Sequence, residues 1–114
     1  MDARTQVAQF ILEEALLRGD GHKVNLVCTQ PRRVAAVSLA ERVAQELGDS
    51  GAGVRDGLVG YQIRMEAKTT AATRLTFCTT GILLRKLQTD PLLEQYTHII
   101  LDEGKSVEII DLWR

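Results

Sequence analysis

The sequence has no long hydrophobic run and no excess of charge of one sign. No stretch of its 114 residues reaches the roughly 18 apolar residues that a membrane-spanning helix requires. The first ten residues are acidic and polar where a signal peptide needs an apolar segment. The formal net charge is −1, so no overall positive field attracts nucleic acids or membranes. We therefore expect an intracellular protein, cytoplasmic rather than nuclear, in which any site for a polyanion is local.

Cysteines and aromatic residues are also scarce. Disulfides are rare in a reducing compartment, so we expect Cys28 and Cys78 to be free and buried; they could pair only if their strands were neighbours. Aromatic residues make up 4% of the chain, so base stacking is not evident and contact with a nucleic acid would be mainly through its backbone. No metal-ligand spacing and no order of Ser, His and Asp typical of a catalytic triad occurs.

The composition is that of one small globular domain, with 45% apolar and 25% charged residues. Helical spacing of apolar residues predicts helices over residues 5–18, 31–47 and 80–88, the second with Pro31 in its first position. Short apolar runs predict strands over residues 24–28, 58–64, 74–78 and 98–103, and Gly60 predicts a bulge or a close approach in the second. Because these strands are apolar throughout, we expect an α/β fold with a parallel sheet that helices cover on both faces.

Two segments, VCTQPRRVAA at residues 27–36 and FCTTGILLRK at residues 77–86, share one pattern. Each leaves a predicted strand through Cys-Thr and opens a predicted helix that carries arginine. In a parallel sheet these strand ends meet at one edge, where α/β folds bind ligands. Helix N-termini attract anions but repel Arg32 and Arg33, a cost that a bound phosphate would relieve.

Hydroxyl groups accompany both segments. Thr29, and either Thr79 or Thr80, can donate to a phosphate or cap a helix. Because the pattern occurs twice on one predicted edge, it would suit two phosphates of an extended nucleic-acid backbone. Each segment by itself is more typical of an ordinary helix cap with solvated arginines, so both interpretations stay open.

Asp102 and Glu103 end the last predicted strand. In folds that hydrolyse phosphate esters, such a pair holds Mg²⁺ through the Asp and positions or activates water through the Glu. The alternative is a solvated acidic turn. The pair on its own favours that alternative, because no other titratable residue clusters with it in the sequence.

Taken in order, these pieces resemble the first RecA-like domain of the DEAH/RHA group of DExH-box ATP-dependent RNA helicases. The resemblance rests on TQVAQFILEEAL, TQPRRVAA, VGYQIRMEAK, CTTGILLRKL and HIILDE. It implies a partial RecA-like fold of the P-loop NTPase type over residues 5–103, followed by a divergent tail over residues 104–114. It also implies ATP and Mg²⁺ as cofactors, with RNA and a second RecA-like domain as partners.

The resemblance assigns roles to particular residues. It implies catalytic roles for Asp102 and Glu103, with Asp102 as the metal ligand. It implies contacts with the RNA backbone for six residues, which are Thr29, Arg32, Arg33, Thr80, Gly81 and Arg85.

The chain departs from the family pattern at both ends. A phosphate-binding loop GxxxxGK[ST] is expected before the first helix, but Ala3 and Arg4 stand where its Lys and Ser/Thr belong. Lys105 replaces the His of the DExH motif, and neither the Ser-Ala-Thr element nor a second RecA-like domain follows. Loss of the phosphate-loop strand also predicts an exposed sheet edge.

The hypothesis is therefore a fragment or truncated isoform of an RNA helicase core. It would contact RNA through TQPRR and TTG but hydrolyse no ATP by itself. Two alternatives remain open: a non-hydrolysing RNA-binding half-core, and a marginally folded product that acts through interactions.

Overall fold

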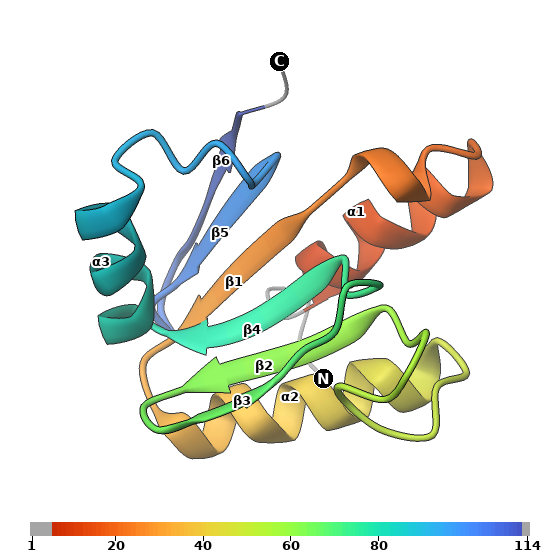
Figure 1. Ribbon diagram of the computed structural model, residues 1–114, viewed down its shortest axis with the longest axis horizontal. Coiled ribbons are helices and arrows are strands. Elements are labelled where there is room, and N and C mark those ends of the chain that lie inside the picture. Colours follow the sequence, from red (N-terminus) through yellow and green to blue (C-terminus); the bar gives the residue numbers. More distant parts are fainter. Residues whose placement is uncertain (1–5, 113–114) are drawn as a thin grey trace.

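The computed structural model describes residues 6–112 as a sheet with helices on both faces (Figure 1). Along the chain, these residues form α1 (Gln6–Leu17), a short 3-10 turn η1 (Gly21–Lys23), β1 (Leu26–Gln30), α2 (Arg33–Glu46), β2 (Val59–Ile63), β3 (Glu66–Lys68), β4 (Leu75–Thr79), α3 (Thr80–Thr89), β5 (His98–Asp102) and β6 (Val107–Asp111). None of the helices in this part of the chain is long and apolar enough to cross a membrane.

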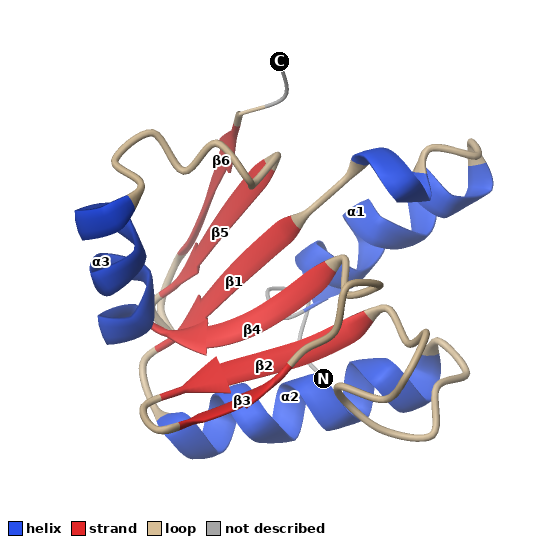
Figure 2. Ribbon diagram, in the orientation of Figure 1, coloured by secondary structure: helices blue, strands red, loops and turns tan. Residues whose placement is uncertain are grey.

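The strand order in the sheet is β3-β2-β4-β1-β5-β6 (Figure 2). The four central strands are parallel, whereas β3 and β6 pair antiparallel with β2 and β5. The predicted α/β class is confirmed, but the expectation of a wholly parallel sheet is wrong. Both outer strands return through short turns, and a short turn can join only antiparallel neighbours.

Strand β6 lies within residues 104–114, the stretch with no clear periodicity in the sequence. It covers β5, so that β3 and β6 form the two edges of the sheet. Ile109 and Ile110 on this edge strand are half-exposed, as is common where a strand has a neighbour on one side only.

The two faces of the sheet have separate cores. One contains buried side chains of α1 and α2 packed on Leu26, Phe77 and Ile100, and the other packs α3 on Val27 and Ile99. Neighbouring strand residues thus point to opposite faces, as the pleat requires. Burial on both faces explains why these strands are apolar throughout.

The two cysteines also lie on opposite faces. Cys28 and Cys78 are buried and free, although β1 and β4 are neighbours, because one thiol joins the α1–α2 core and the other the α3 core. Burial raises the pKa of each thiol to about 12. The prediction of free, buried cysteines is confirmed, and both thiols are protonated and unreactive at neutral pH.

Gly60 in β2 marks a close approach, one of the two features that the sequence predicts there. A Cβ at this position would collide with the carbonyl oxygen of Lys68, at the end of β3, and lie 3.0 Å from Cγ2 of Thr69. A Cβ at Gly81, in contrast, meets nothing within 4 Å.

We predict that Gly60→Ala lowers the free energy of unfolding by about 1–3 kcal/mol, because β3 must move away from β2. Gly81→Ala is the matched control and leaves stability unchanged or slightly raised, since alanine favours the helix. Urea unfolding followed by circular dichroism measures both. Equal stability of the two variants would contradict the close packing of β3 on β2.

Candidate nucleic-acid interface

The two Cys-Thr segments meet at the carboxyl ends of β1 and β4. These strands are parallel neighbours, with Gln30 opposite Thr79. The chain leaves β1 toward α2 on one face and leaves β4 toward α3 on the other (Figure 1). Two helices therefore begin at adjacent strand ends and diverge, which is the position where open α/β sheets bind ligands.

Arg32 and Arg33 form the start of α2. Arg32 is its N-cap, with extended backbone (φ −132°, ψ 147°), and Arg33 is the first helical residue. Pro31 therefore precedes the helix, and the expectation that it occupies the first helical position is wrong. Both arginines are exposed, and neither guanidinium group forms a hydrogen bond or an ion pair with another side chain or backbone group of residues 6–112.

The start of α3 presents open backbone. Thr79 is the N-cap but makes no capping hydrogen bond through its side chain, and Thr80 and Gly81 are exposed in the first turn. Arg85 is exposed one turn later. Neither α2 nor α3 has an acidic residue in its first turn. Neither helix thus carries a carboxylate of its own that would offset the positive end of its dipole.

Thr29 differs from the other five residues predicted to contact RNA. It is only 2% exposed, within β1, and pleat alternation puts its side chain on the α3 face of the sheet. Its hydroxyl does not lie on the exposed edge with the arginines. The N-cap position of the helix that follows is Arg32, which makes no capping hydrogen bond through its side chain.

Asp102 is 5% exposed and holds two parts of the fold together. Its Oδ2 accepts a hydrogen bond from Nε2 of Gln30 at 3.0 Å, and its Oδ1 accepts one from the backbone N–H of Gly104 at 2.9 Å. Gln30, which the sequence did not single out, thereby links the end of β1 to the β5–β6 turn. Glu103 is exposed in that turn, where its backbone N–H donates to the carbonyl of Ser106 at 3.0 Å.

The surroundings of Asp102 and Glu103 show whether the described residues could bind ATP and Mg²⁺. Residues 6–112 contain no group of three or more His, Cys, Asp or Glu side chains that could hold a metal ion. Both carboxylate oxygens of Asp102 accept hydrogen bonds within the fold, and no phosphate loop occurs in this part of the sequence. Ala3 and Arg4 lie outside the described residues. The described residues therefore do not form a complete site for ATP and Mg²⁺.

The turn between β2 and β3 adds a cation that the sequence patterns did not single out. Arg64 and Met65 are exposed at the same sheet edge, and Met65 has a positive φ of 68° and is 94% exposed. Arg64 is the last residue of the strand predicted over residues 58–64, whereas β2 ends at Ile63 and leaves Arg64 in the turn.

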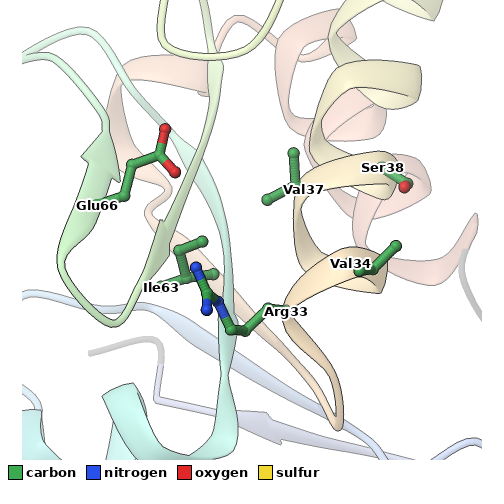
Figure 3. A pocket seen from close by; sticks show the side chains of 6 residues that line it. All are labelled: Arg33, Val34, Val37, Ser38, Ile63 and Glu66. Carbon is green, nitrogen blue, oxygen red and sulfur yellow. The ribbon is translucent and has the colours of Figure 1, made fainter.

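A pocket of about 380 Å³ lies between α2 and the β2–β3 hairpin (Figure 3). Arg33 and Glu66 are the charged residues of its wall. The remaining lining residues are Val34, Val37, Ser38 and Ile63.

We predict that Asp102→Ala lowers the free energy of unfolding by about 1–3 kcal/mol, because it removes two hydrogen bonds to a buried carboxylate, those from the Gln30 amide and from the Gly104 N–H. Glu103→Ala, the neighbouring exposed carboxylate, should change it by less than about 0.5 kcal/mol. Thermal and urea unfolding report both. If the two variants were equally stable, the Asp102 hydrogen bonds would not hold the strand ends together.

Comparison with known proteins identifies the chain's relatives. No family model matches it. It is 61% identical over 101 residues to the ATP-dependent RNA helicase dhx29 of Xenopus laevis, 51% over 100 residues to the ATP-dependent RNA helicase DHX30 of Gallus gallus, and 48% over 101 residues to the ATP-dependent DNA/RNA helicase DHX36 of Homo sapiens.

Each match covers 87% of this chain but only 7%, 8% and 10% of the respective relative. The resemblance inferred from the motifs is thereby confirmed. The chain belongs to the DExH/DEAH-box family of ATP-dependent RNA helicases and corresponds to one segment of these longer proteins.

Proposed function

We propose that this chain is part of the first RecA-like domain of an RNA helicase core and binds the phosphate backbone of RNA at the carboxyl edge of its sheet. One observation carries the proposal. The exposed Arg32 and Arg33 stand beside the exposed first turn of α3, although the two segments are about 50 residues apart in the sequence. Arginine and free helix N–H groups are the donors that bind phosphate.

The charges at this edge support an anionic ligand. Two guanidinium groups beside the positive end of α2 repel that end and each other unless a negative group lies between them. Because the net charge of the chain is −1, the chain as a whole does not attract anions, and the attraction for phosphate is limited to this edge. RNA supplies phosphates at regular intervals, which matches donors on two neighbouring strand ends better than one small anion does.

The RecA-like assignment has two supports. The parallel order β2-β4-β1-β5 with helices on both faces is an open α/β sheet, and the relatives are ATP-dependent helicases by name. In this proposal Asp102 and Glu103 occupy the positions that serve Mg²⁺ and water in the family. A second RecA-like domain of a longer parent would complete the nucleotide site.

We predict salt-sensitive binding of single-stranded RNA that Arg32→Ala plus Arg33→Ala weakens at least about tenfold, because both guanidinium groups that donate charge-assisted hydrogen bonds to phosphate are removed. The slope of log affinity against log salt should flatten by about 0.7 for each phosphate that the variant no longer neutralises, or about 1.4 for two phosphates. Fluorescence anisotropy with a labelled ten-nucleotide RNA measures both quantities.

The matched control is Arg42→Ala plus Arg55→Ala. It removes the same charge from the far half of α2 and from the loop that precedes β2, at the opposite edge of the sheet. We expect it to leave the salt slope within about 0.3 of the parent value. If both double variants weakened RNA binding equally, binding would depend only on the net charge of the chain. The proposal that RNA binds at this edge of the sheet would then be rejected.

We also predict that the 114-residue chain hydrolyses ATP no faster than buffer, with or without RNA, because the described residues lack a phosphate cradle. A phosphate-release assay checks this. ATP turnover that Glu103→Gln abolished would show that the isolated chain is an active ATPase.

A further inference from the structure

The pocket between α2 and the β2–β3 hairpin combines apolar walls with two opposite charges. Val34 and Val37 of α2 and Ile63 of β2 form the apolar part, and Figure 3 shows Val37 pointing from α2 toward the hairpin. Its volume of about 380 Å³ lies within the range of ligand pockets in proteins. A flat, mostly apolar group with a polar edge is the kind of ligand that such a pocket accepts.

The position of the pocket ties it to the RNA edge. Arg33 lines the pocket and also stands at the start of α2, beside the proposed phosphate contacts. A strand held by its phosphates at Arg32 therefore brings an attached base within reach of the pocket. Guanidinium planes also stack on nucleobases, which suits an arginine in its wall.

Glu66 determines which base would fit. Its Oε2 accepts a hydrogen bond from the Tyr61 hydroxyl at 2.8 Å, and no hydrogen bond from residues 6–112 reaches its Oε1. Burial and this hydrogen bond raise the pKa of Tyr61, so its phenol remains a donor at neutral pH. The carboxylate is thus oriented by Tyr61, with Oε1 open to a ligand and with Oε2 able to accept a second hydrogen bond through its other lone pair.

A carboxylate accepts hydrogen bonds and repels other acceptors. Guanine offers two adjacent N–H donors, at N1 and N2, on its Watson–Crick edge. Adenine and cytosine offer one exocyclic amino group, and uracil presents two carbonyl oxygens around a single N–H. The chemistry of the pocket therefore selects guanine over uracil most strongly.

We propose that this pocket binds a guanine base of single-stranded RNA, with Glu66 accepting from its N1–H and N2–H and with Val37 and Ile63 packing on the ring. The proposal rests on RNA binding at the neighbouring edge. An apolar side chain of a partner protein is the competing occupant, but it would make no use of the open oxygen of Glu66.

Three labelled RNAs test the proposal with the 114-residue chain: ten uridines, and the same oligomer with a central guanosine or inosine. Inosine keeps the N1–H of guanosine and lacks its amino group. We expect the guanosine RNA to bind about tenfold tighter than the uridine RNA, because a bidentate contact to a base gives discrimination of this order. The inosine RNA should bind with intermediate affinity.

Glu66→Gln should abolish the difference between guanosine and uridine RNA. Glu94→Gln is the matched control, since Glu94 is an exposed carboxylate in the loop between α3 and β5. Circular dichroism melts establish that both variants fold. The inosine comparison needs no protein variant, so it tests the contact even if Glu66→Gln unfolds.

The outcomes separate this inference from the proposed function. Salt-sensitive binding with equal affinity for guanosine and uridine RNA, or a preference that survives in Glu66→Gln, overturns the guanine pocket and leaves the phosphate edge standing. Such a result would assign the pocket to a different occupant, such as an apolar protein side chain. Absence of salt-sensitive binding to all three RNAs overturns the proposed function together with the pocket.

Discussion

The parallel pairing of β1 with β4 is the constraint on which the rest of the structure depends. It brings two segments that are about 50 residues apart in the sequence to within one strand spacing, about 4.8 Å. Because α2 and α3 then leave toward opposite faces, their first turns open side by side. Without this pairing, Arg32 and Arg33 would be two solvated arginines and Thr80–Gly81 an ordinary helix start.

The two sites implied by the family resemblance are physically close in this fold. Gln30 is the last residue of β1, so it precedes the arginine segment, and its amide also holds the buried carboxylate of Asp102. The buried carboxylate of Asp102 and the arginines proposed to contact phosphate are therefore both connected to the carboxyl end of β1. A change in the hydrogen bonds of Asp102 acts directly on the residue from which the chain turns toward Arg32.

Much of the fold could be predicted from the sequence, since its central elements are strongly patterned. The four apolar runs became the four parallel strands, and the three helical patterns became α1, α2 and α3. The edge strands could not be predicted in this way. Residues 66–68 are exposed and two of the three are charged, and β6 has exposed apolar side chains, so neither shows the pattern of a buried strand.

The candidate site was predictable in part. Arginines and a Thr-Gly pair after apolar runs mark the edge of a parallel sheet, because topology alone places them there. Which side chains are accessible depends on packing. Thr29 is buried and Asp102 is paired, whereas the pocket beside Arg33 requires the β2–β3 hairpin to fold against α2. These contacts join residues too distant in the sequence for local patterns to reveal.

In the proposed function, RNA phosphates lie on the edge between α2 and α3. Titration of a ¹⁵N-labelled chain with a ten-uridine RNA tests it most directly, through the chemical shifts of individual backbone amides. We expect the amides of Arg33, Thr80 and Gly81 to shift first and to saturate together, while Gly57 and Thr70 at the opposite edge stay unchanged. Shifts confined to the opposite edge, or spread evenly over the surface, would contradict it.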